Sequence, residues 1–303
     1  MRARLGLLLG ALALASCRGL TLAEVDRLHD SIDARTVLRE ERFTLWSPLD
    51  VEASRAWAEL VARELPAVEG AFDPARLAPE RLQVLLERVE VPAIPLPGPG
   101  ESATVQVYPA GSRNGVVGHA SGDVVTLYLA PPNRFRLRSG RVVESETQPE
   151  RLTFVLRHEL THVACRRAGL QLPTWLSEGA ADMVESLALE DGALMDRGPP
   201  EEAVARALAL ERFDWRVAPL LDWSERGERI ARGEEAVDMP RRHLCGLYVR
   251  WLLGLRGDGR PVRDLARRLA ELAARPRAAL LAGEAEWSAW LAVLGGAEGP
   301  AAP

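Results

Sequence analysis

The chain has 303 residues and no lysine, because all 38 of its basic residues are arginine. Aromatic residues make up only 5%, and there are just five histidines and three cysteines. We interpret the missing lysine as compositional bias, since alanine, leucine and arginine are abundant throughout. The formal net charge of −5 gives no surplus of positive charge for nucleic acid, so we expect no nucleic-acid partner. The length allows one large domain or two modest ones.

The chain also lacks a long apolar run at its start. Arg2 and Arg4 precede an apolar stretch from residue 5 to residue 15, which is too short to span a bilayer and is typical of a secretory signal. The stretch ends in "LASC", which resembles a bacterial lipobox. This resemblance implies a signal peptide over residues 1–16 and a lipid anchor at Cys17.

The expected location is therefore the bacterial cell envelope, with the membrane reached through the lipid at Cys17. The next residue is Arg18 rather than aspartate, which favours the outer membrane, on its periplasmic side or at the surface. A signal that is uncleaved or ordinarily cleaved, with an incidental cysteine, is the alternative.

Cys165 and Cys245 are the other two cysteines. Outside the cytoplasm they have the opportunity to form a disulfide. Two separate buried thiols are the alternative, because the sequence does not give the distance between their backbones.

The residue pattern changes near Pro149, from mixed strand and helix signals to mainly helical ones. We expect a tether or leading helix over 17–40, a mixed αβ subdomain over 41–148, a helical subdomain over 149–295 and a disordered tail over 296–303. In the first subdomain the residue patterns predict a helix over 50–71, strands over 42–48, 81–89, 103–109 and 122–130, another strand or turn near 134–143, and a loop over 91–100. In the second they predict a short element at "VAPLLDW" and helices over 150–168, 174–190, 240–255, 261–274 and around Trp287 and Trp290.

The strongest motif is "HELTH", residues 158–162. On a helix, residues four apart share a face, so His158 and His162 present two imidazoles to one point. Zinc accepts such a pair, and a catalytic site needs one further protein ligand and an open position. Glu159 would lie beside the metal, where it can take a proton from the attacking water.

Together with "LPTWLSEGAADMVE", this motif resembles the gluzincin metallopeptidases with a peptidase MA-like domain. The resemblance implies that His158, His162 and Glu178 bind zinc and that Glu159 is the general base. It also implies that Asp182 orients one ligand histidine by accepting its other N–H. The implied fold is α+β and thermolysin-like, with the active-site cleft between the two subdomains.

A weaker likeness extends over residues 40–292, and it includes a later helix at "HLCGLYVRWLLG". In gluzincins a tyrosine or histidine from such a helix often donates a hydrogen bond to the developing oxyanion. His243 stands where the pattern usually has tyrosine, and Tyr248 is the other candidate. We expect a structural or solvent role for Glu185 and a turn role for His119, although the segment around His119 could be the sheet edge that aligns substrate.

The sequence therefore predicts a zinc metallopeptidase with one Zn²⁺ per chain and a protein or peptide substrate. A Gly-x-Met-Glu-Asn stretch is absent, which argues against an aminopeptidase, so we expect an endopeptidase. One alternative is a catalytically silent zinc-binding lipoprotein that acts as a binding or assembly module. Another is a helical module without metal.

Overall fold

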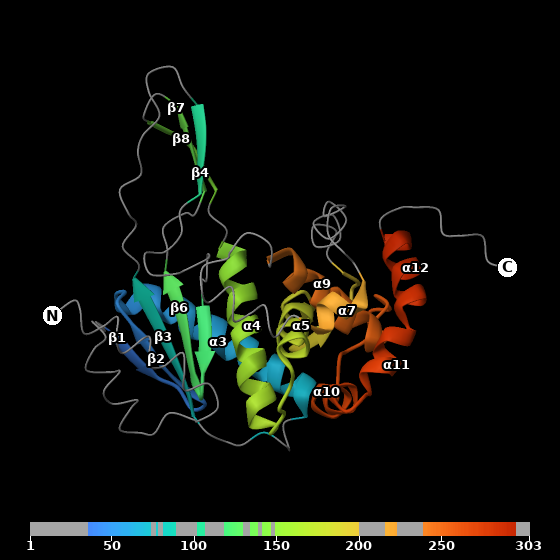
Figure 1. The fold of residues 1–303 in the computed structure, drawn as a ribbon. Helices are drawn as coiled ribbons and strands as arrows, with labels where there is room; N and C mark the ends of the chain where they lie inside the picture. The colour runs from blue at the N-terminus through green and yellow to red at the C-terminus, as the bar shows by residue number, and fades with distance from the viewer. Residues whose placement is uncertain are drawn as a thin grey trace, which may run out of the picture. The chain divides into compact units, whose positions relative to one another are not determined.

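The structure is a computed structural model that contains both helices and strands (Figure 1). It describes residues 36–73, 77, 81–88, 102–106, 118–129, 134–138, 141–146, 149–199, 216–222 and 239–294. The described residues fall into two compact units. The first lies within 36–60, 79–110 and 116–148, and the second within 61–78 and 149–294. The division passes through helix α3 (Val51–Phe72).

The first unit contains a five-stranded mixed sheet in the order β1-β2-β3-β6-β5 (Figure 1). Its inner strands β2, β3 and β6 run parallel, and the outer strands β1 and β5 are antiparallel to their neighbours. The bounds are β1 (Thr36–Arg39), β2 (Phe43–Ser47), β3 (Leu82–Arg88), β5 (Gly118–Ser121) and β6 (Val124–Leu129). Leu82, Val84, Leu85 and Leu86 are all at most 2% exposed, as expected for a central strand covered on both faces.

The first unit also contains a three-stranded antiparallel sheet in the order β4-β7-β8. Its strands are β4 (Ser102–Gln106), β7 (Arg134–Arg138) and β8 (Arg141–Glu146). The strands expected in this unit are confirmed to within a few residues. The expected strand or turn near 134–143 is a pair of strands. Strand β5 was not predicted, because its glycine-rich sequence was assigned to a turn. The prediction of a tether or leading helix up to residue 40 is wrong at its end, because residues 36–39 form β1 and pair with β2.

The second unit is mainly helical. Its helices are α4 (Pro149–Arg167), α5 (Thr174–Glu185), α7 (Val217–Leu221), α9 (Met239–Leu252), α10 (Leu265–Ala273), α11 (Arg277–Ala282) and α12 (Glu284–Leu294). Helix α5 packs against both α4 and α9 (Figure 1). No helix among the described residues is long and apolar enough to cross a bilayer.

The prediction that the second helix continues to residue 190 is wrong. Helix α5 ends at Glu185, and a hairpin of β9 (Ala188–Glu190) and β10 (Ala193–Met195) follows. Asp191 and Gly192 form its two-residue turn with φ values of 48° and 76°, and Asp-Gly is a favoured pair for such a turn. The N-cap of α5 is Pro173.

Candidate metal centre

Helix α4 carries the "HELTH" motif of residues 158–162. Leu156, Leu160 and Val163 are at most 2% exposed, and their spacing of four and three residues gives α4 a buried apolar stripe. The helix ends where Gly169 takes φ +70° and donates to the carbonyl of Arg166 at 2.8 Å, while Leu170 donates to that of Cys165 at 3.0 Å. These two hydrogen bonds form a Schellman motif, which ends the helix at Gly169.

Three polar side chains from α4 and α5 meet at one point. Nε2 of His158 lies 3.2 Å from Nε2 of His162. The Glu178 carboxylate lies 3.5 Å from the first of these nitrogens and 3.4 Å from the second. The three therefore form a compact group of donors in which each offers one atom to a shared centre.

The exposure of this group is uneven. The side chain of His158 is 5% exposed, whereas those of His162 and Glu178 are 21% and 27% exposed. Glu159 is also buried and does not belong to the group of three. The cluster therefore has a buried side toward His158 and a side that solvent reaches.

The outer nitrogens of both histidines also have partners. Nδ1 of His158 lies 3.3 Å from Oδ1 of Asp182 and 3.2 Å from Oε2 of Glu185. Nδ1 of His162 lies 3.2 Å from the hydroxyl of Ser177. Such contacts fix the orientation and tautomer of a ligand imidazole.

Glu185 and Ser177 were missed as partners by the sequence analysis. The sequence position of each residue could have identified it as a partner. Glu185 is one turn beyond Asp182 on the same helix, and Ser177 directly precedes Glu178. Helical spacing puts Asp182 and Glu185 on one face, and Glu185 lies 3.2 Å from Nδ1 of His158 with a side chain that is 27% exposed.

The two candidates on α9 are placed very differently. Nδ1 of His243 lies 3.2 Å from Oδ2 of Asp182, and its side chain is 23% exposed. The hydroxyl of Tyr248 donates to the carbonyl of Leu280 at 3.1 Å, and its ring stacks on Trp251 at 5.7 Å. Tyr248 is fully buried and its hydroxyl is already bonded in an aromatic cluster, so its proposed oxyanion role is not supported.

Cys165 and Cys245 are free and buried, so they are two separate thiols in this structure. Burial raises the pKa of Cys165 to about 12. The pKa of Cys245 is raised well above its ordinary value by burial first and then by the charges of Asp182 and Glu178. A thiolate is therefore disfavoured at both positions.

The residue that precedes His158 anchors α4. Arg157 donates to Oε2 of Glu64 at 2.9 Å, and both side chains are at most 5% exposed. Arg157 also donates to the carbonyls of Glu185 and Leu187. A second buried pair, Arg167 with Glu69 at 3.0 Å, lies at the other end of α4.

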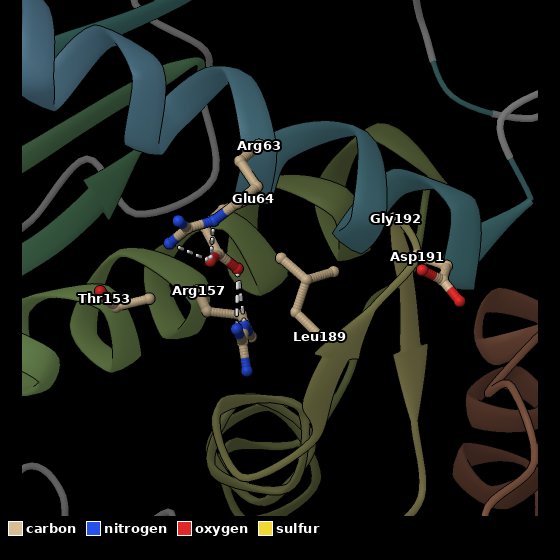
Figure 2. Close-up of a pocket in the computed structure, with 7 residues that line it drawn as sticks. All are labelled: Arg63, Glu64, Thr153, Arg157, Leu189, Asp191 and Gly192. Carbon is tan, nitrogen blue, oxygen red and sulfur yellow. Dashed lines mark hydrogen bonds and ion pairs between the residues drawn. The ribbon is translucent and has the colours of Figure 1, made fainter.

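The Arg157–Glu64 pair lies in a pocket of about 350 Å³ (Figure 2). Its lining residues are Arg63, Glu64, Thr153, Arg157, Leu189, Asp191 and Gly192. None of them is a predicted metal ligand, and the charges of Arg157 and Glu64 neutralise each other. The pocket is therefore separate from the histidine–glutamate cluster.

Some predictions fall on residues that the structure does not describe. These residues are Cys17 and the signal over 1–16, the tether up to residue 35, the loop 91–100 and the tail 296–303. His119 lies in β5, opposite Thr126 of β6. This places it on an outer strand of the sheet rather than in a turn.

Comparisons with known proteins provide no assignment. No family model matches the chain, and no curated protein or solved structure matches it.

Proposed function

We propose that the chain is a zinc-dependent metallopeptidase of the gluzincin type, with a thermolysin-like catalytic domain. His158, His162 and Glu178 would hold one Zn²⁺, and a protein or peptide would be the substrate. The lipid anchor at Cys17 would hold the enzyme at the cell envelope.

The observation that carries this proposal is the spacing of the three donor atoms. Zinc bonds of about 2.0–2.1 Å in tetrahedral geometry require donor atoms about 3.4 Å apart. The three donor separations are 3.2, 3.4 and 3.5 Å. Two imidazoles and one carboxylate are also donors that zinc commonly takes, so the residues fit the metal.

The number of donors supports catalysis rather than structure. Structural zinc sites usually close all four positions with protein, whereas catalytic sites have three protein ligands. The cluster has three, and its His162 and Glu178 side is partly exposed. Bound zinc would supply a Lewis acid that polarises a carbonyl and makes water more acidic.

The chain's own residues would then move the proton. Glu159 follows the first ligand and would take a proton from the attacking water, then pass it to the leaving amine. His243 would donate a hydrogen bond to the oxyanion. Since its Nδ1 faces Asp182, it would donate from Nε2, which requires the doubly protonated ring.

A catalytically silent zinc-binding lipoprotein is the second candidate. The buried Glu159, which directly follows His158, argues against it, because a purely binding site has no use for a base. Peptide cleavage by the wild type decides between the two.

The test combines metal analysis with cleavage of a broad peptide library by the full-length protein. Wild type should carry about one zinc and His162→Ala should lose it. Glu159→Gln should retain zinc, while its kcat falls by about 10²–10⁴-fold, the usual contribution of a general base.

Glu271→Gln is the matched control, because Glu271 is exposed on α10 and pairs only with Arg267 among the contacts described for it. It should match wild type in both measurements. If Glu159→Gln cleaves as fast as this control, the proposed mechanism is wrong. If wild type binds zinc and cleaves nothing in the library, the silent binding module replaces it.

A further inference from the structure

One buried carboxylate lies between imidazoles from two different helices. Oδ1 of Asp182 is 3.3 Å from Nδ1 of His158 on α4, and Oδ2 is 3.2 Å from Nδ1 of His243 on α9. The side chain of Asp182 is only 5% exposed. Each oxygen therefore lies within ion-pair distance of Nδ1 of a different ring.

We propose that Asp182 is a shared positioning residue, which orients the metal ligand His158 and the oxyanion donor His243 at the same time. This inference rests on the proposed function for the role of His243, but the sharing itself is a property of the chain that can be measured without activity. Asp182 lies against the two rings and is not one of the three proposed ligands, so it would act through the rings.

Close packing of α5 against α9 brings the rings to this carboxylate. A Cβ added at Gly246 would lie 2.8 Å from Cβ of Asp182, and one added at Gly179 would lie 2.7 Å from the carbonyl oxygen of Cys245. Neither distance is compatible with a side chain. The two glycines therefore permit the helix contact that sets His243, one turn before Gly246, against Asp182.

The shared aspartate would favour a proton on Nδ1 of both rings. If each Nδ1 donates to Asp182, Nε2 of each ring is left for the opposite side. For His158 that opposite side is the metal cluster, because its Nε2 faces His162 and Glu178. For His243, Nε2 becomes the atom available to a substrate.

Glu185 distinguishes the two roles of Asp182. Its Oε2 lies 3.2 Å from the same Nδ1 of His158, so His158 keeps one carboxylate partner when Asp182 is changed. The contact described for His243 is with Asp182 alone. Loss of the Asp182 charge should therefore disturb His243 more than it disturbs metal binding.

The test uses Asp182→Asn, which keeps the size and Cβ of the side chain, in the full-length protein. Nitrogen-15 NMR of the imidazoles in the zinc-loaded protein should show His243 protonated at Nδ1 in wild type. Asp182→Asn should remove this preference, and the matched variant Glu185→Gln should keep it. Zinc affinity, measured by chelator competition, should fall by about 10-fold in each variant, the low end for a lost outer partner.

Kinetics give a second readout. His243→Gln and Asp182→Asn should each lower kcat more than they raise KM, and the double variant should be no slower than His243→Gln alone. Additive losses would overturn the inference, and so would protonation at Nδ1 of His243 that is the same in wild type and Asp182→Asn. If Asp182→Asn does not fold, Asp182→Ala is measured in its place with the same expected results.

Failure of the proposed function would look different. If the protein binds zinc but cleaves no peptide, Asp182→Asn should still change the protonation at Nδ1 of His243. If the protein cleaves peptides but Asp182→Asn leaves this protonation unchanged, the proposed function stands and the shared role of Asp182 is wrong.

Discussion

Two regions of the second unit present polar side chains in different ways. The α4–α5 pair turns two histidines and three carboxylates toward one small volume, in contacts of 3.2–3.5 Å. Helix α9 instead divides its polar groups, with His243 toward Asp182 and Tyr248 toward an aromatic cluster. The α4–α5 pair therefore gathers the donor groups that a metal site needs. Helix α9 instead contacts this site through one face and packs into the hydrophobic core through the other.

The first prediction concerns the buried Arg157–Glu64 pair, which anchors α4. Arg157→Ala removes the buried partner of the fully buried Glu64 and three hydrogen bonds that reach α3, α5 and the following segment. Loss of one partner of a buried pair costs about 3–5 kcal/mol. Urea denaturation should show this loss in the free energy of unfolding.

Arg63→Ala is the matched control, because Arg63 contacts the same glutamate from the surface with a side chain that is 59% exposed. It should change the free energy of unfolding by less than about 1 kcal/mol. Equal losses for the two arginines would mean that the buried pair does not anchor α4.

The second prediction separates the two faces of α9. His243→Gln should lower kcat by about 10²–10³-fold, the loss seen when one oxyanion donor is removed. Tyr248→Phe should leave kcat unchanged, because the Tyr248 hydroxyl is bonded to Leu280. Steady-state kinetics of both variants on one peptide would make this comparison, and a large kcat effect of Tyr248→Phe alone would reverse the assignment.

The third prediction concerns the helix contact that joins the two regions. Gly246→Ala places a methyl group 2.8 Å from Cβ of Asp182, so we expect a loss of about 1–3 kcal/mol from overpacking. Gly70→Ala is the control, since an added Cβ there meets no atom within 4 Å. Thermal unfolding of both variants would check the result, and equal melting temperatures would contradict the close packing.

The smallest effect is expected at the two thiols. Burial raises the pKa of Cys165 to about 12 and raises that of Cys245 as well, so at pH 8 almost none of either thiol is in the reactive thiolate form. Iodoacetamide should label neither cysteine in the native protein and both after denaturation. Rapid native labelling of Cys245 would show that the α5–α9 interface opens.

The sequence predicted the α4–α5 region well because its signals are local. Four-residue spacing puts His158 and His162 on one face wherever the helix forms, and Gly169 ends that helix through its own backbone freedom. The placement of Glu178 came from the resemblance. The orientation of α9 is different, because it depends on which face packs against α5 and which against α11 and α12. Since that choice depends on distant residues, His243 and Tyr248 were left as alternatives.

The same distinction explains the missed polar contacts. Glu64 and Arg157 are 93 residues apart, and no local pattern links them. Glu185 was one helical turn from Asp182, but its role depended on the exact position of His158 on the neighbouring helix. Short local motifs therefore identified the candidate site, while its supporting contacts required the three-dimensional structure.

The central claim is that His158, His162 and Glu178 together hold zinc. Anomalous X-ray diffraction at the zinc absorption edge, on crystals of the zinc-loaded protein, tests it most directly. The account predicts one strong peak, about 2 Å from Nε2 of both histidines and from the Glu178 carboxylate. A peak at other residues, or none at this cluster at saturating zinc, would contradict it.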